Sequence, residues 1–209
     1  SFPAWIEIYN QLAPDFHLPP INPNEIDKFK DLNFKEFVAN NHINPLNLSR
    51  IIVKVKQHLR PVIKDLPVFD GLIPVLEKLK KSAYPLGILT SNSSQNVRPF
   101  LNHHQIGHLF DFIYTGKDIF GKDKVIKRLL YQKQLGRDEV VYIGDEARDI
   151  DAAQKVGIPI ISVTWGFNSS DVLSRHHPTA LAAVRTDGAV RNHLSWPTPP
   201  PPCPVAPFA

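Results

Sequence analysis

The sequence predicts an α/β fold: a Rossmann-like parallel sheet with helices on both faces, joined to an all-helical unit. From about residue 72 onward, short apolar runs alternate with amphipathic segments, which is typical of parallel strands that are covered on both faces and linked by helices. The first 67 residues show apolar side chains only at helical spacing. A chain of 209 residues is long enough for both parts.

The helical unit is expected to span residues 1–67. Residues 2–12 carry apolar side chains on one face, which predicts a first helix. Asn24 and Ser49 are residue types that cap helices, so each predicts the start of another helix. Apolar residues follow each cap at helical spacing: Ile26, Phe29, Phe34 and Phe37 after Asn24, and Ile52, Val55, Leu59, Val62 and Ile63 after Ser49.

The α/β core is expected to span residues 68–181. Strands are predicted at 86–89, 110–114, 140–143 and 158–163, and helices at 72–82, 96–104, 124–134 and 147–156. Ligands bind such sheets beyond the carboxyl ends of the strands, so we expect the chemistry directly after each strand. Residues 182–209 are expected to be a disordered tail, because seven of the last thirteen residues are proline.

Composition narrows the classes of partner. The net charge of +4 comes from basic residues scattered along helices, which predicts a solvated face and no nucleic-acid partner. No apolar run approaches the roughly 20 residues that cross a bilayer, so no membrane partner is expected. The single cysteine, Cys203, is typical of a reducing compartment, and a cytoplasmic location is expected.

Two turns carry residues that suit a phosphate. Thr90, Ser91 and Asn92 follow the first predicted strand, where hydroxyls and free backbone N–H groups can cradle a phosphate; a plain helix cap is the alternative. After the second strand, residues 116–122 nearly match the P-loop pattern, and Lys122 can place a positive charge over a phosphate. Asp123 replaces the magnesium-binding hydroxyl of that pattern, which argues against a P-loop.

The turn after the third strand is acidic. Asp145 leaves the strand directly behind Gly144, Glu146 follows, and Asp149 lies one helical turn further on. Converging carboxylates suit a hard cation such as Mg²⁺. Acidic residues also stabilise a helix N-terminus, which accounts for Glu146 but less well for Asp145. Asp145, Glu146 and Asp149 are therefore the candidate metal ligands.

Together these motifs resemble the haloacid dehalogenase-like hydrolases, in particular phosphoglycolate-phosphatase-like members with a helical cap. The stretch Gly144-Asp145-Glu146-Ala147-Arg148-Asp149 resembles the family's acidic motif, and residues 165–167 resemble a loop of that branch. The resemblance implies a phosphatase that uses Mg²⁺ and acts on a small phosphorylated metabolite. It implies that Ser91 and Lys122 bind the transferring phosphoryl group and act in catalysis, with Thr90 and Asn92 beside them in substrate binding.

One motif of that family is absent from the sequence. No D-x-D-G-T occurs, and Asp70-Gly71 does not substitute for it because residue 68 is Val. The family's nucleophile is the first aspartate of that motif, so the sequence predicts that these 209 residues have little or no phosphatase activity. Because the sequence has no Met and Ser1 resembles the region just after that motif, the chain is expected to begin after its nucleophile strand. A non-catalytic phosphate-binding module and, less favoured, a P-loop nucleotide-binding protein are the alternatives.

Overall fold

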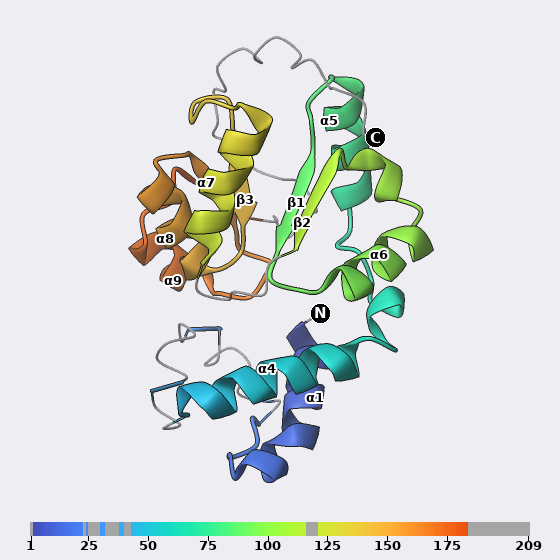
Figure 1. The fold of residues 1–209 in the computed structure, drawn as a ribbon, viewed down its shortest axis with the longest axis vertical. Helices are drawn as coiled ribbons and strands as arrows, with labels where there is room; N and C mark the ends of the chain where they lie inside the picture. The colour runs from blue at the N-terminus through green and yellow to red at the C-terminus, as the bar shows by residue number, and fades with distance from the viewer. Residues whose placement is uncertain are drawn as a thin grey trace.

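The computed structural model describes residues 2–22, 24, 30–31, 38–39, 43–115 and 121–183. It confirms the predicted fold class: an α/β unit with parallel strands and a separate helical unit (Figure 1). The N-terminal helices lie together at one end of the molecule, and the strands with their covering helices lie at the other. Within the described residues, no helix is both long and apolar enough to cross a membrane.

The helical unit is built on two helices, α1 (Phe2–Leu12) and α4 (Pro45–Leu59), with short 3₁₀ segments η1 (Ala13–Phe16) and η3 (Ile63–Asp65). The apolar faces of α1 and α4 pack together, and removing these side chains from water stabilises the pair. The core of the unit includes Ile6, Tyr9, Leu12, Ile51, Val55 and Leu59, all buried.

The start predicted for the third helix of the helical unit, at Ser49, is wrong. Ser49 lies inside α4, not at its end. The helix begins one turn earlier because Asn44 accepts a hydrogen bond from the Asn47 N–H at 2.8 Å and Pro45 occupies the first helical position, where its missing N–H costs nothing. The helix predicted after Asn24 falls mostly outside the described residues.

The α/β unit contains five described strands: β1 (Gly87–Thr90), β2 (Phe112–Thr115), β3 (Tyr142–Gly144), β4 (Ile160–Val163) and β5 (Ala180–Ala182). Its described helices are α5 (Leu72–Lys81), α6 (Ser94–His103), α7 (Lys122–Lys133), α8 (Ala147–Val156) and α9 (Ser170–Arg175), with a 3₁₀ segment η4 (Gly107–Leu109). The sequence did not predict α9 and β5, because six and three residues are too few for a periodic signal.

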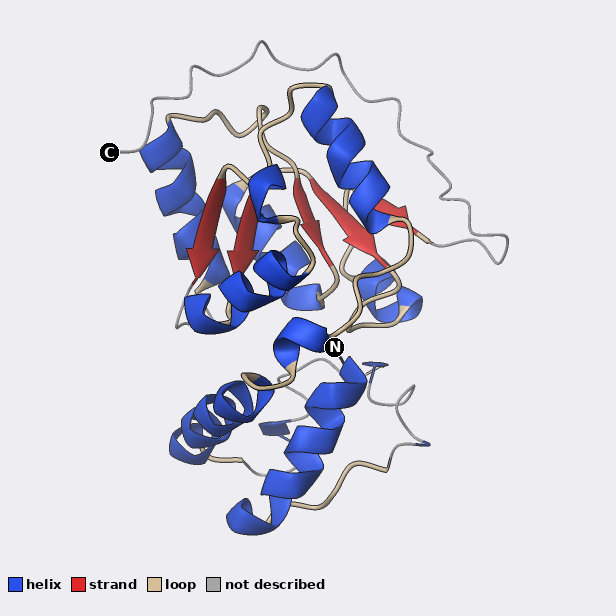
Figure 2. Cartoon of the chain, turned by 90° about the vertical axis from the view of Figure 1, so that its right-hand side faces the viewer, coloured by secondary structure: helices blue, strands red, loops and turns tan. Residues whose placement is uncertain are grey.

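The strands form two parallel sheets rather than one. β1 pairs with β2, and β4 lies between β3 and β5. In Figure 2 the two sheets lie side by side, and the arrows of β1 to β4 point toward the helical unit. The described strands include none that bridges the two sheets, so each sheet has an unpaired inner edge. Ile143, on β3, is 55% exposed.

Helices cover both faces of the strands. Successive residues of a strand point to opposite faces: Ile88 packs with residues of α5 and α6, whereas Leu89 packs with residues of α7 and α8. The larger of the two cores includes Ile126, Ile150, Ala153, Ile160 and Leu173, which are almost fully buried. This packing holds the carboxyl ends of β1 and β3 at the same end of the α/β unit (Figure 2).

Candidate active site

Three predicted phosphate-binding residues lie in the turn after β1. Two of them form hydrogen bonds within the turn, and the third does not. The Thr90 Oγ1 accepts a hydrogen bond from the Asn92 N–H at 3.0 Å. The Asn92 Oδ1 accepts one from the Asn96 Nδ2 at 2.9 Å. Within the described part of the chain, the Ser91 hydroxyl forms no hydrogen bond, although its residue is partly buried. Thr90 and Asn92 therefore fix the turn, and the Ser91 hydroxyl has no hydrogen-bond partner among the residues that the structure describes.

Lys122 and Asp149 form a buried ion pair that joins α7 to α8. The Lys122 Nζ donates to the Asp149 Oδ1, and the two side chains are 14% and 3% exposed. Tyr142, on β3, donates its hydroxyl to the same oxygen at 2.9 Å. Burial, followed by the charge of Asp149, raises the pKa of the Tyr142 hydroxyl, so it stays protonated and donates. The predicted lysine and one predicted acid are thus in direct contact.

Among the three predicted acidic residues, Asp145 is the one whose negative charge is least offset by a neighbouring cation. Burial raises the pKa of its carboxyl, and the nearby carboxylates of Glu146 and Asp149 raise it further. A hydrogen bond from the Phe167 N–H to the Asp145 Oδ2, at 2.8 Å, acts in the opposite direction, as does the charge of Lys122. A carboxylate in this position gains from any added positive charge.

Glu146 is held by a neighbouring arginine. The Arg148 guanidinium donates to the Glu146 Oε2 through both Nε and Nη2, and both side chains are mostly buried. The Glu146 N–H donates to the Asp149 Oδ2 at 3.3 Å, closing the first turn of α8. Glu146 is therefore the N-cap residue of α8 and is paired with Arg148.

The loop after β4 closes over the acidic turn. The Asn168 N–H donates to the Asp145 carbonyl oxygen at 3.0 Å, and the Asn168 Oδ1 accepts from the Ala147 N–H at 2.9 Å. Gly166 lies against Asp145 so closely that a Cβ at position 166 would be 2.2 Å from the Asp145 Cβ. The loop is thus bound to Asp145 and its neighbour at several points.

The three carboxylates of the acidic turn offer the oxygen atoms that a hard divalent cation prefers, but only one of them has no cationic partner in the described part of the chain. Mg²⁺ favours oxygen ligands and is held in proteins by one or two carboxylates. Two of the three predicted carboxylates are matched by Lys122 and Arg148, and Asp145 has no cationic partner at contact distance among the described residues. Among those residues, no three His, Cys, Asp or Glu side chains are arranged to hold a metal ion. Asp145 is therefore the residue best placed for direct ligation.

Replacing Asp145 with asparagine is expected to raise the free energy of unfolding at neutral pH. The raised folded-state pKa means that the folded chain binds this proton more tightly than the unfolded chain. The contribution of Asp145 to stability is therefore present below its unfolded pKa of about 3.9 and is lost as pH rises through the folded pKa. The asparagine side chain keeps an acceptor for the Phe167 N–H without the charge.

Urea unfolding of the wild type and of Asp145→Asn between pH 4 and pH 8, without divalent cations, measures this effect. The wild type should lose stability relative to the variant as pH rises. Parallel pH profiles would show that Asp145 carries no charge penalty in the folded chain.

Sequence reasoning found the charged members of the site but not the polar residues that position them. Tyr142, Asn168 and Asn96 were missed. Asn96 lies one helical turn after Asn92, a spacing that could have suggested the contact. Tyr142 and Asn168 act through the tertiary fold, and no local pattern marks them.

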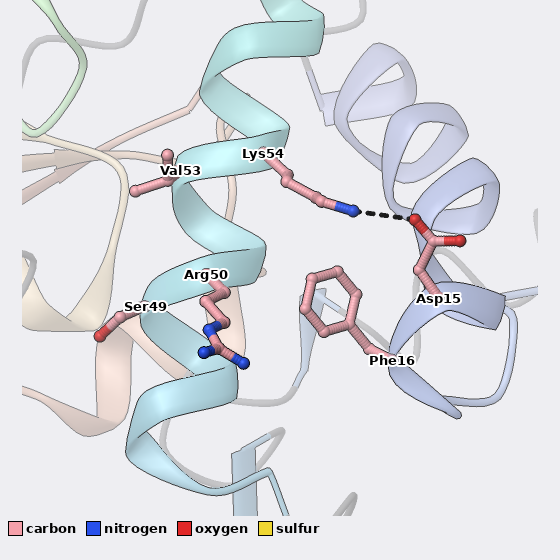
Figure 3. Close-up of a pocket in the computed structure, with 6 residues that line it drawn as sticks. All are labelled: Asp15, Phe16, Ser49, Arg50, Val53 and Lys54. Atoms are coloured by element: carbon pink, nitrogen blue, oxygen red, sulfur yellow. Dashed lines mark hydrogen bonds and ion pairs between the residues drawn. The ribbon is translucent and has the colours of Figure 1, made fainter.

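A separate hollow lies on the helical unit. It has a volume of about 490 Å³ and lies between α4 and η1, lined by Asp15, Phe16, Ser49, Arg50, Val53 and Lys54 (Figure 3). None of these residues belongs to the α/β unit. The Lys54 Nζ is bound to the Asp15 Oδ2 at 2.9 Å and lies 5.2 Å from the centre of the Phe16 ring. The Lys54 cation is therefore paired within the helical unit, and the hollow is separate from the residues that follow β1 and β3.

Comparison with known proteins identifies the family. The model of the haloacid dehalogenase-like hydrolase family matches residues 1–163, which include every predicted site residue. The chain belongs to the haloacid dehalogenase-like hydrolase family. This confirms the family resemblance that the motifs predicted.

Several of the curated relatives are phosphatases, and one is a 5'-nucleotidase. The chain is 31% identical over 187 residues to the phosphoglycolate phosphatase of Synechococcus elongatus, covering 90% of this chain and 88% of that one. It is 33% identical over 126 residues to a 5'-nucleotidase of Pseudomonas aeruginosa, covering 56% of this chain and 57% of that one. A predicted phosphatase from Clostridium acetobutylicum has the same fold, with a TM-score of 0.75 at 20% identity and 88% of each chain covered.

Proposed function

We propose that the chain carries the phosphate- and cation-binding parts of a phosphatase that acts on a small phosphomonoester such as phosphoglycolate, with residues 1–67 as its cap. The Synechococcus relative supports this substrate class. The observation that carries the proposal is the acidic turn, where Asp145, which has no cationic partner at contact distance among the described residues, lies beside a lysine that is held in place by Asp149. Carboxyls with perturbed pKa values are enriched at functional sites.

Each residue has a role that follows from its contacts. Ser91 offers its hydroxyl to a phosphoryl oxygen, with Thr90 and Asn92 holding the turn. Lys122 supplies positive charge near the transferring group, and Asp149 fixes its direction while Tyr142 holds Asp149. Fixed donors that match the charge of a transition state contribute strongly to phosphoryl transfer.

Asp145 is the proposed direct ligand of Mg²⁺, while Glu146 and Asp149 shape the turn around it. The cation, when bound, would neutralise negative charge on the phosphate. It would also offset the repulsion that raises the Asp145 pKa. This proposal narrows the three predicted ligands to one principal residue supported by two others.

The nucleophile is the missing part. The resemblance implies an aspartate that attacks phosphorus, displaces the alcohol and forms an aspartyl-phosphate, which water then hydrolyses. The 209 residues contain no D-x-D-G-T motif. We therefore propose that this chain binds phosphate with Mg²⁺ but does not hydrolyse phosphomonoesters.

Calorimetric titration of the 209-residue chain with inorganic phosphate, with and without Mg²⁺, tests the binding. Binding is expected only with Mg²⁺ present. Lys122→Met should weaken it by about 10–100-fold and Ser91→Ala by about 2–10-fold, in line with charged and neutral hydrogen bonds. Lys124→Met, on an outer face of the same helix, is the matched control and should leave phosphate affinity unchanged.

Assays with p-nitrophenyl phosphate and Mg²⁺ test the lack of turnover. The rate should not exceed the buffer blank. Turnover at ordinary enzyme rates would contradict the proposed inactivity. If the folded wild type does not bind phosphate, the proposed site is contradicted. Lys122→Met also breaks the ion pair with Asp149 and can lower stability. Ser91→Ala leaves that ion pair intact and therefore tests the site separately.

The sequence predicted two alternative functions and a location for this chain. Phosphate binding without turnover is also the property of a non-catalytic binding module, which is the alternative function for this chain. The P-loop alternative rests largely on residues 116–120, which lie outside the described residues. We propose a cytoplasmic location on the basis of the single cysteine.

A further inference from the structure

Lys56 is the point where the helical unit reaches the phosphate-binding turn. Its Nζ donates to the Ser91 carbonyl oxygen at 2.5 Å. Its own carbonyl oxygen accepts a hydrogen bond from the Asn96 Nδ2 at 2.9 Å. One turn further along the chain, the Arg60 guanidinium donates to the Gln95 side chain. The end of α4 is thereby fixed against the start of α6, with the Lys56 amine at the turn.

The charge of Lys56 is not matched. Among the described residues it forms no ion pair, and its acceptor is a neutral carbonyl. Burial lowers the pKa of the Lys56 amine, because an ammonium ion that loses water without gaining an anion is destabilised. Lys54, two residues earlier on α4, is instead paired with Asp15. An anion beside Lys56 would supply the missing partner.

The position of Lys56 indicates which anion that is. Lys122 approaches the site from α7, in the α/β unit, whereas Lys56 approaches from α4, in the helical unit. Ser91, whose carbonyl Lys56 contacts, is the residue proposed to bind a phosphoryl oxygen. A group next to Lys56 is therefore close to the phosphate and on the side of the helical unit.

We propose that Lys56 is a specificity-determining residue that binds an anionic group on the alcohol part of the substrate. The chain then prefers phosphomonoesters that carry a carboxylate a few bonds from the phosphate over uncharged ones. This inference rests on the proposed phosphate site and adds the feature that selects the substrate.

Calorimetric titrations of the 209-residue chain with Mg²⁺ present test it with three probes: 2-phosphoglycolate, ethyl phosphate and inorganic phosphate. Lys56→Met is expected to weaken 2-phosphoglycolate binding by about 10-fold or more, the value of a charged hydrogen bond. The affinities for ethyl phosphate and inorganic phosphate should fall by a clearly smaller factor, because neither probe carries a second anionic group beside Lys56. Lys54→Met should change none of the three affinities, because its cation is held by Asp15 on the helical unit.

Lys56→Gln removes the charge but keeps an N–H donor, on a side chain that is one bond shorter, and so helps to separate charge from folding. It should reproduce the selective loss of 2-phosphoglycolate affinity with an unchanged urea midpoint. An equal loss for all three probes, or no loss, would overturn the role of Lys56 while leaving the phosphate site intact. If the wild type binds none of the probes, the proposed function fails, and this inference fails with it.

Discussion

Replacing Asp149 with alanine is expected to lower the free energy of unfolding by about 3–5 kcal/mol, the cost of leaving one member of a buried ion pair alone. Asp149 is 3% exposed at its side chain and accepts hydrogen bonds from Lys122, Tyr142 and the Glu146 N–H. Its removal strands the Lys122 ammonium and the Tyr142 hydroxyl in a site with little access to water. Urea unfolding at pH 7, followed by circular dichroism, measures the change.

Asp151 provides the matched control on the same helix. Its side chain is 40% exposed and contacts the His176 Nδ1 at 2.9 Å, so Asp151→Ala should cost only about 0–1 kcal/mol. Asp149→Asn keeps the shape and one acceptor, and should fall between the two. Equal losses for Asp149→Ala and Asp151→Ala would show that the Lys122 pair contributes no more than a surface contact.

The elements of this fold could be predicted well where periodicity extends over a long segment. α1 and α8 have the predicted bounds, because an amphipathic face repeated over three turns leaves few alternatives. Ser49 shows where such reasoning fails: several residue types near the start of α4 can cap a helix, and only the fold selects Asn44. The split into two sheets could not be predicted from strand patterns, which carry no record of which strands pair.

The residues of the candidate site also differ in whether the sequence could predict them. Asp145, Lys122 and Ser91 were predicted because charged and hydroxyl residues directly after apolar strands are conspicuous. Their partners could not be found in this way, since the contact of Asp149 with Lys122 joins residues 27 positions apart. Lys56 was missed for the same reason: in the sequence it is one of several lysines on a helix, and only the contact with Ser91, 35 residues away, distinguishes it.

Gly166→Ala is expected to damage both stability and cation binding through Asp145. A Cβ at position 166 would lie 2.2 Å from both the Cβ and the Oδ2 of Asp145, far inside van der Waals contact. Because the Asp145 Cβ is next to the main chain, the loop must move, which breaks the hydrogen bond from the Phe167 N–H. We expect a loss of about 1–3 kcal/mol in the free energy of unfolding, typical of overpacking, and weaker Mg²⁺ binding by calorimetry.

Gly107→Ala is the matched control, since its nearest new contacts would be 3.8 Å away, and its effect should stay within about 0.5 kcal/mol. A double-mutant cycle identifies the cause. In an Asp145→Gly background the colliding Cβ is gone, so Gly166→Ala should cost much less than in the wild type. An unchanged cost in that background would mean that position 166 is constrained by something other than Asp145, and the close approach of the loop to the acidic turn would lose its structural importance.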